Sequence, residues 1–282
     1  MSNTVKITVL VENTAKGNLR GEHGLSYLIE SEGSKMLFDT GQSDLIIGNA
    51  AKLGLGLGDV NSIVLSHGHY DHTGGLGAVL EQLDKPAELF LHPEALKPKY
   101  KRLPGREYKA IGIDAEAAKK IEESFNISKV TFTEEPTKVG GIFTVTSTVP
   151  RKNDFEDVSG PFYKDTEFKI ADGIEDDQSL FFQSSKGVVV ILGCCHSGVV
   201  NTLEYIAELA GSGKIHAVIG GMHLLHADEE RLEKTMQVFE KYDVDMIAAG
   251  HCTGMKAVAG FWNRFKGKTR ECCCGAKFEF TL

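Results

Sequence analysis

The chain has 282 residues and a formal net charge of −8 at pH 7, and hydrophobic residues make up 41% of it. This apolar content suffices for a folded core, so the composition excludes a mostly disordered chain. The acidic balance argues against a protein that binds nucleic acid mainly through phosphate contacts, and we expect no nucleic-acid partner. The length fits one large domain or two small ones.

The sequence predicts neither a membrane span nor a signal peptide. The longest apolar stretch covers residues 187–193, whereas a membrane-spanning helix needs about 20 apolar residues. The N-terminal run Met1–Glu12 lacks the apolar segment and the small-residue cleavage site of a signal peptide. We therefore expect a cytoplasmic protein with no membrane partner. The sequence carries no signal for an oligomeric state.

The first part of the chain predicts mainly strands, because β-branched and apolar runs alternate with turn residues. Ser62–Ser66 is nearly all apolar, as expected for a strand covered on both faces. In chain order, strands are expected over Val5–Val11, Leu25–Glu30, Lys35–Asp39, Ser62–Ser66 and Ala87–Leu91, and helices over Asp44–Leu53 and Leu76–Leu83.

The later part repeats this pattern of strands followed by amphipathic helices. Strands are expected over Gly187–Leu192, Ile215–Ile219, Val244–Ala249 and Ala276–Phe280, and helices over Val199–Leu209, Glu229–Tyr242 and Gly254–Phe265. Clusters of strands followed by β-α-β alternation, twice over, predict two β-sheets packed together with helices outside.

Two charged stretches stand apart from this pattern. Residues 151–177 carry nine acidic and four basic side chains, which fits either an inserted lid or a solvated excursion. Residues 97–109 carry six basic side chains and one acidic one. Such a run is usually a solvated face, but in an acidic protein it can also collect an anionic substrate. The candidate substrate-binding residues in it are Lys97, Lys99, Lys101 and Arg102.

The segment Ser66–Gly75 carries the clearest chemical signal. Three histidines and one aspartate fall within six residues, directly after a predicted strand. Imidazole and carboxylate groups are ligands of Zn²⁺ and of its transition-metal neighbours. Gly68 and Gly74 are expected to allow tight backbone turns between them. The candidate metal ligands are His67, His69, Asp71 and His72.

Further ligands must come from elsewhere, because a mononuclear site needs about three protein ligands and a binuclear site needs more. Three other loops, each directly after a predicted strand, supply candidates. They are Cys194, Cys195 and His196 in the first loop, His223 in the second, and His251 and Cys252 in the third. Ligand-bearing loops at equivalent strand ends predict one shared site. His223 is explained equally well as a hydrogen-bonded residue at a strand end.

The pattern His67-x-His69-x-Asp71-His72, preceded by the strand and turn Leu37–Gly41, resembles the metallo-β-lactamase superfamily. The resemblance covers nearly the whole chain. It implies a single α+β domain over residues 1–282, folded as a four-layer αββα sandwich with a metal site at one edge of the two sheets.

The same resemblance implies roles for individual residues. His67 and His69 are expected to bind one metal ion with a third histidine, and Asp71 and His72 a second ion with His251. Asp39 is expected to orient a ligand histidine through a ring N–H. One or two divalent transition-metal ions are therefore implied; zinc is favoured, and manganese and iron are compatible with these ligands.

Four segments resemble one branch of the superfamily more closely. They are Glu22–Ser26, Gly193–Gly198, Gly220–Leu224 and His251–Gly254. The branch is named after 7,8-dihydropterin-6-methyl-4-(β-D-ribofuranosyl)-aminobenzene-5′-phosphate synthase, and the name implies a pterin and a phosphate-bearing substrate.

One position departs from the superfamily pattern. Superfamily members usually place an aspartate that spans both metal ions after the strand that corresponds to Gly187–Leu192. Here Cys194 and Cys195 follow that strand instead. Either a cysteine takes this role, or His196 binds metal and there is no bridge. His196 is the first choice for the third histidine, and His223 is its competitor.

These residues lead to a first hypothesis, a metal-dependent hydrolase or related transferase that uses metal-activated water on a small anionic substrate. Asp71 is expected to orient the water and help move its proton. His23 is placed near the mouth of the site by the resemblance, where it binds substrate or donates a proton; an ordinary buried or surface histidine is the alternative.

Two other hypotheses remain open. An iron–sulfur or electron-carrying protein on the same fold would use Cys194, Cys195 and Cys252, together with the run Cys272, Cys273 and Cys274, because such clusters need thiolates. The spacings match neither common ferredoxin pattern. A non-catalytic metal-binding module is the third hypothesis, and the intact histidine motif argues against it.

Overall fold

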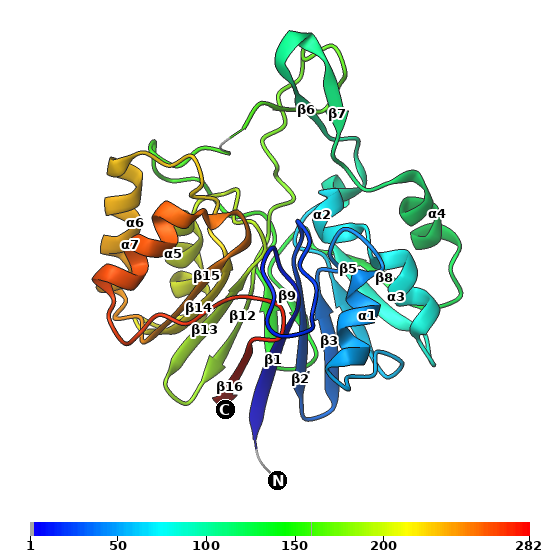
Figure 1. The fold of residues 1–282 in the computed structure, drawn as a ribbon, viewed down its shortest axis with the longest axis horizontal. Coiled ribbons are helices and arrows are strands. Elements are labelled where there is room, and N and C mark those ends of the chain that lie inside the picture. The colour runs from blue at the N-terminus through cyan, green and yellow to red at the C-terminus, as the bar shows by residue number, and fades with distance from the viewer. Residues whose placement is uncertain (1–2, 159) are drawn as a thin grey trace.

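The computed structural model describes residues 3–158 and 160–282. Within these residues, two large β-sheets pack face to face, and helices cover the outer surface of each sheet (Figure 1). The predicted four-layer αββα sandwich is therefore confirmed. No helix in the described ranges is long and apolar enough to cross a membrane.

Seven strands of the described chain form the first sheet: β1 (Thr4–Val11), β2 (Ser26–Ser31), β3 (Ser34–Phe38), β4 (Ser62–Val64), β5 (Ala87–Leu91), β8 (Ile127–Phe132) and β16 (Lys277–Thr281). Their order across the sheet is β16-β1-β2-β3-β4-β5-β8. The pairs from β16 to β3 are antiparallel, and those from β3 to β8 are parallel. The last strand, β16, thus returns to the edge next to the first.

Six strands of the described chain form the second sheet: β9 (Thr137–Val139), β10 (Phe143–Val145), β12 (Leu180–Ser184), β13 (Gly187–Leu192), β14 (Ile215–Gly221) and β15 (Met246–Gly250). Their order is β15-β14-β13-β12-β10-β9. The three strands β13, β14 and β15 run parallel, because each is followed by a helix that returns the chain to the other end.

Three apolar layers hold the sandwich together. Between the sheets, alternate strand residues point inward, and the largest fully buried ones are aromatic, among them Tyr27, Phe38, Phe143 and Phe182. Burying such a side chain contributes about 1.5–3 kcal/mol. The outer layers consist of α1 (Leu45–Lys52), α3 (Leu76–Gln82) and α4 (Ala115–Glu123) on the first sheet, and α5 (Val199–Ala210), α6 (Glu229–Lys241) and α7 (Met255–Arg264) on the second.

A small third sheet lies outside the sandwich. It pairs β6 (Tyr100–Arg102) with β7 (Tyr108–Ala110) and with β11 (Phe162–Tyr163). In Figure 1 the β6–β7 hairpin projects from the end of the sandwich opposite the C-terminus. The segment 151–177, expected to be a lid or an excursion, supplies β11. Ser159 within it lies outside the described residues. That the segment acts as a lid stays a prediction.

The strands and helices expected from the sequence are all present, with ends shifted by up to two residues in most cases. The expected strand Val244–Ala249, for example, is β15, Met246–Gly250. The elements between residues 97 and 184 were not predicted. Most of them are short or solvent-exposed strands, such as β7 with three exposed residues, and three residues are too few for the alternation of apolar and polar side chains to indicate a strand.

Candidate metal centre

The candidate ligands lie beyond the carboxyl ends of strands, as predicted, either in loops or in the short helices α2 (Tyr70–Thr73) and η3 (His251–Thr253). Asp39 follows β3, and His67 comes shortly after β4 in the first sheet. Cys194, His223 and His251 follow the three parallel strands β13, β14 and β15 of the second sheet. Parallel strands end at the same edge, so the fold brings five loops from two sheets to one place.

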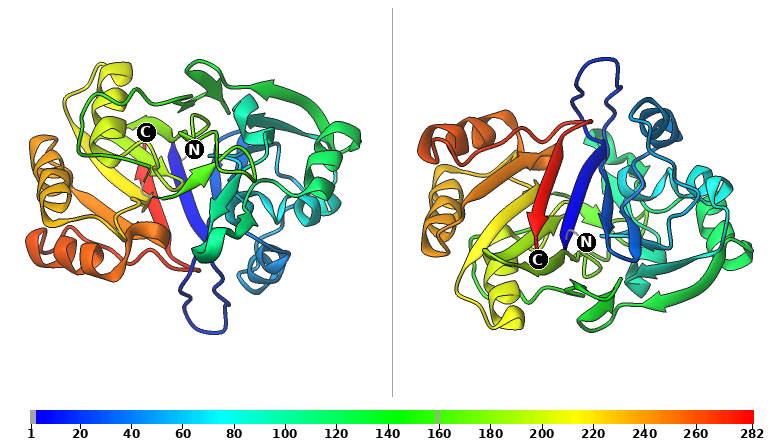
Figure 2. Two further views of the ribbon diagram at one scale, coloured as in Figure 1. Left: turned by 90° about the horizontal axis from the view of Figure 1, so that it is seen from above. Right: turned by 90° about the horizontal axis from the view of Figure 1, so that it is seen from below.

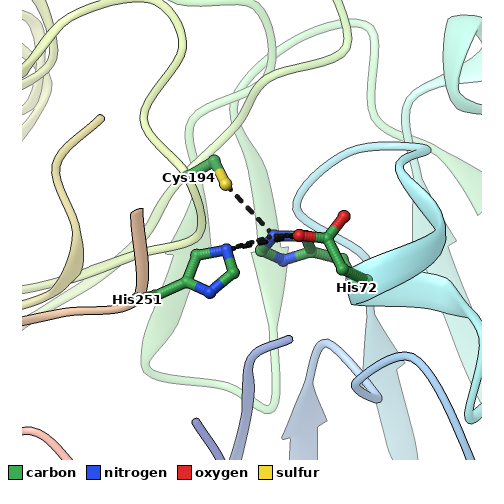
Figure 3. Close-up of side chains that lie close together, drawn as sticks. His72, Cys194 and His251 are labelled. Carbon is green, nitrogen blue, oxygen red and sulfur yellow. Dashed lines mark hydrogen bonds and ion pairs between the residues drawn. The ribbon is translucent and has the colours of Figure 1, made fainter. Parts of the chain in front are cut away.

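The first group of ligand atoms comprises Asp71, His72, Cys194 and His251, all buried and within 4.8 Å of one another. His72 Nε2 lies 3.2 Å from both His251 Nε2 and Cys194 Sγ (Figure 3). Asp71 Oδ2 lies 3.4 Å from His251 Nε2. The three chain segments that carry these four residues therefore direct their ligand atoms toward one another.

The second group comprises His67, Cys194 and His196, which are also buried and within 4.8 Å of one another. His69 lies beside it, since its Nδ1 is 2.9 Å from His67 Nε2 and its ring centroid is 5.0 Å from that of His196. A third group consists of Cys194, His223 and Cys252. Cys194 belongs to all three groups.

His196 and His223, the two candidates for the third histidine, belong to different groups of ligand atoms. His196 shares a group with His67, and its ring also lies 5.0 Å from the ring of that residue. His223 shares a group with Cys252 instead, and its ring centroid lies 4.1 Å from that of His196, with the two ring planes tilted by 45°. His196 therefore lies nearer to the histidine motif than His223 does.

The donor atoms fit a transition-metal ion. His69 Nε2 and His196 Nε2 are buried without a hydrogen-bond partner among the described residues, an arrangement that is costly for a polar atom unless another ligand satisfies it. His67 Nε2 faces His69 Nδ1, and His72 Nε2 faces His251 Nε2. Nitrogen, sulfur and carboxylate donors of this kind bind zinc and its neighbours.

The protonation states also suit metal binding. Burial lowers the pKa of His67 and His196 well below the usual range of imidazole, and lowers the pKa of His69 to about 3. These rings are therefore neutral at pH 7, the form that binds a metal ion. Burial acts to raise the pKa of Asp71, but His72, His23 and His251 outweigh it and hold the pKa well below its usual value.

A cavity of about 390 Å³ opens above these groups. Its floor carries the ligands, and its walls combine aromatic and apolar side chains with basic ones. It is lined by Asn13, His23, His69, Tyr70, Asp71, Lys101, Leu103, Lys109, Ile111, Phe162, Cys194, His196, His223, Leu225, His226, His251 and Cys252.

The sequence model of the metallo-beta-lactamase superfamily matches residues 19–205, more than half of the chain. The chain belongs to the metallo-β-lactamase superfamily. This family binds metal ions, and the histidine, aspartate and cysteine groups described above lie where the resemblance of the sequence motif implied a site.

Two curated relatives come from Methanocaldococcus jannaschii. One is named 7,8-dihydropterin-6-methyl-4-(beta-D-ribofuranosyl)-aminobenzene-5'-phosphate synthase; it is 32% identical, and the match covers 98% of this chain and 97% of the relative. The other is an uncharacterized protein, 34% identical, with 89% and 92% covered. A solved structure described as a metal-dependent hydrolase of the beta-lactamase superfamily is 32% identical, with a TM-score of 0.83 and 99% of this chain covered.

Two side chains orient candidate ligand histidines of this metallo-β-lactamase fold. Asp39 Oδ2 lies 2.6 Å from His72 Nδ1, which leaves Nε2 of His72 to face the first group. Asn13 Oδ1 lies 3.0 Å from His251 Nδ1, which likewise turns Nε2 of His251 toward His72. The sequence motif implied Asp39 but gave no signal for Asn13.

Buried carboxylates also hold the backbone of the ligand loops. Glu12 accepts a hydrogen bond from the backbone N–H of His251 at 2.6 Å, and Asp176 accepts one from Gly68 at 2.7 Å. Asp177 accepts one from Ser197 at 2.8 Å. These three acids lie far from the ligands in sequence, so sequence reasoning missed them.

The loops adopt backbone conformations that are rare for these residue types. Asp39, Cys195, His223 and His251 all have positive φ, between 46° and 63°. Each such residue costs about 1–3 kcal/mol, and such residues cluster at functional sites. Gly68 serves a different purpose from the turn expected of it: a Cβ there would lie 2.2 Å from the carbonyl oxygen of Ala95, so the position requires glycine for close packing.

Three of the four predicted substrate-binding residues do not line the cavity. Lys99 is buried, and its Nζ donates to Asp176 Oδ1 at 2.7 Å and to Asp172 Oδ2 at 3.2 Å. Its charge therefore serves an internal ion pair, and the prediction for it is wrong. Lys97 is exposed outside the cavity lining, and the Arg102 guanidinium packs over the Phe168 ring. Lys101 lines the cavity.

The other cysteines lie away from the ligand groups. Cys195 turns into the helix layer, with Sγ 3.3 Å from Thr202 Oγ1. Cys272 Sγ lies 3.8 Å from the Tyr27 hydroxyl, and Cys274 Sγ donates to the carbonyl of Glu12. Cys273 packs in the core between the sheets. Among the described residues, these four thiols belong to none of the candidate metal groups; a metal or redox role for them stays a prediction.

Proposed function

We propose that this chain is a metal-dependent hydrolase or related transferase that acts on a small anionic substrate carrying a phosphate or pterin group. The observation that supports this most is that two groups of buried ligands share Cys194 at the floor of one open cavity. His67, His69 and His196 would hold one ion with Cys194. Asp71, His72 and His251 would hold the other.

A divalent ion in such a site lowers the pKa of bound water to about 7 and polarises a carbonyl or phosphoryl oxygen. The protein's side chains would position the water and the substrate around this ion. The Asp71 carboxylate lies beside both His72 and His251, so it is placed to orient the attacking water and accept its proton.

His23 is the candidate proton donor. Its Nε2 lies 3.2 Å from Asp71 Oδ2, and its ring stacks on that of His251 at 5.2 Å. The side chain is 55% exposed, so it contacts both the buried carboxylate and the space that a substrate would fill. A histidine in this position can transfer a proton between Asp71 and a leaving group.

The cavity walls support an aromatic substrate with an anionic group. Tyr70 and Phe162 contribute aromatic rings to the lining, and Ile111 contributes an aliphatic side chain. Lys109 donates to the Tyr70 hydroxyl at 3.0 Å and lies over the Tyr70 ring, and Lys101 stands on the same wall. The name of the jannaschii relative includes a pterin and a phosphate, which is the chemistry that such walls would accept.

The iron–sulfur alternative receives less support from the geometry. Iron–sulfur clusters are usually held by four thiolates. The groups found among the described residues contain at most two, Cys194 and Cys252. The histidine-rich donor set favours single metal ions instead.

The test is turnover of phosphate esters and pterin phosphates by protein purified without oxygen and loaded with Zn²⁺, Mn²⁺ or Fe²⁺. We expect metal-dependent turnover that Asp71→Ala abolishes while the chain stays folded. His216→Ala is the matched control, because this histidine pairs with Asp245 away from the cavity. Turnover by Asp71→Ala equal to the unmodified chain, or none with any metal across the panel, would contradict the proposal.

A separate experiment tests whether the lysines of the cavity bind an anionic group of the substrate. Removing Lys101 and Lys109 together should raise KM for phosphate-bearing substrates several-fold, roughly 1 kcal/mol for two exposed charges, with little change in kcat. Lys97→Ala removes a charge from the same basic run outside the cavity lining and should leave KM unchanged. Equal KM values for all three proteins would show that these lysines do not bind substrate.

A further inference from the structure

We infer that Cys194 binds both metal ions at once, so that one thiolate bridges the two halves of the centre. This inference rests on the proposed function and goes beyond it, because it identifies the bridging atom as sulfur. Cys194 belongs to the group of Asp71, His72 and His251 and also to the group of His67 and His196. Its Sγ lies within 4.8 Å of every ligand atom in both groups.

The distances suit a sulfur ligand. With Zn–S bonds of about 2.3 Å and Zn–N bonds of about 2.0 Å, sulfur and nitrogen ligands of one tetrahedral ion lie roughly 3.5 Å apart. Cys194 Sγ and His72 Nε2 are 3.2 Å apart, and His251 Nε2 is at the same distance from His72 (Figure 3). A small outward movement of these side chains would admit an ion.

The backbone selects Cys194 over its neighbour. The two cysteines lie in the loop that begins after Leu192, the last residue of β13, and the backbone of this loop turns their side chains in different directions. Cys194 points to the cavity, and Cys195, with a φ of 61°, turns its sulfur to Thr202 beneath α5. Cys195 is therefore a matched control of the same residue type, one position away.

A bridging thiolate changes which ion the centre prefers. Thiolate is a soft ligand that favours zinc, cobalt and ferrous iron, whereas carboxylate and water suit manganese and magnesium. A thiolate carries the same single negative charge as the aspartate usual at this position, so the charge balance of the centre is kept. The structure thus assigns this chain a softer centre than an aspartate bridge would give.

The test is cobalt substitution, since a sulfur–cobalt bond gives an intense near-ultraviolet charge-transfer band that nitrogen and oxygen ligands lack. The unmodified chain and Cys195→Ser should bind two Co²⁺ ions and show the band. Cys194→Asp should keep two ions and lose the band, and its preference should shift from Zn²⁺ toward Mn²⁺ in competition titrations. Cys252→Ser should retain the band.

Other outcomes overturn the inference in distinguishable ways. If the unmodified chain binds two Co²⁺ ions without the band, or if Cys194→Asp retains it, the bridge is not Cys194 sulfur, and the proposed hydrolase still stands. If a single ion binds with the band, Cys194 is a ligand but not a bridge. If no cobalt binds at all, both the bridge and the proposed function fail.

Discussion

Oδ2 of Asp39 lies 2.6 Å from Nδ1 of His72, and both side chains are fully buried. The same carboxylate accepts the backbone N–H and the hydroxyl of Ser66, each at 2.7 Å. One residue from β3 thereby fixes the ring orientation of His72 and anchors the start of the histidine motif. Replacing such a hydrogen-bond partner of a metal-binding histidine lowers the affinity of the site for its metal ion.

Asp39→Asn should weaken metal binding at the group of His72 by about 10–100-fold. The amide NH₂ would face a donor, because both carboxylate oxygens accept hydrogen bonds in the native protein. The measurement is a Zn²⁺ competition titration with a chromophoric chelator. Unchanged affinity for both ions would show that Asp39 does not orient His72.

His23→Gln should separate metal binding from catalysis. His23 contacts Asp71 but belongs to none of the candidate ligand groups among the described residues, so metal content should not change. If it transfers a proton, kcat should fall by about 10²–10⁴-fold. Metal analysis and turnover are measured on the same preparation. A loss of metal, or turnover within a factor of two of the unmodified chain, would contradict this role.

Lys99→Met should destabilise the fold. It leaves Asp172 and Asp176 buried without their cation, and removing one partner of a buried ion pair costs about 3–5 kcal/mol. Because Asp176 also holds Gly68 of the histidine motif, metal affinity should fall as well. Urea unfolding of the metal-free chain measures the cost. Lys101→Met, an exposed lysine two residues away, should change stability by less than about 0.5 kcal/mol.

Cys272 and Cys274 should resist alkylation in the folded chain. Burial raises the pKa of Cys274 to about 12 and that of Cys272 well above its usual value. Little thiolate therefore exists at pH 8, and the thiolate is the reactive form. Stability should also fall as the pH rises above about 8.5, because the unfolded chain ionises these thiols first. Mass spectrometry after iodoacetamide treatment, native against urea-unfolded, tests both residues; equal labelling rates would contradict their burial.

The part of the centre that the sequence predicted is the part encoded locally. His67, His69, Asp71 and His72 occupy one loop, and their spacing alone suggests metal chemistry. Cys194 and His251 were found because each follows an apolar strand, and parallel strands end at one edge.

The part that the sequence did not predict depends on contacts between distant segments. Glu12 and Asn13 hold His251 across more than 230 positions of the chain. Asp176 supports the histidine motif from the segment 151–177, for which a solvated excursion was one interpretation, and its partner Lys99 comes from the basic run 97–109. The sequence does not distinguish a lysine that is buried in an ion pair from one that is exposed. The different environments of Lys99 and Lys101 could therefore not be predicted without the fold.

The most direct test of the central claim is elemental analysis with acid-labile sulfide determination on protein purified without oxygen. The account predicts one or two Zn, Mn or Fe ions per chain and no sulfide, with metal lost in a variant that lacks His67 and His72 but retained when His216 is replaced. Iron with near-stoichiometric sulfide, or no bound metal in the folded chain, would contradict it.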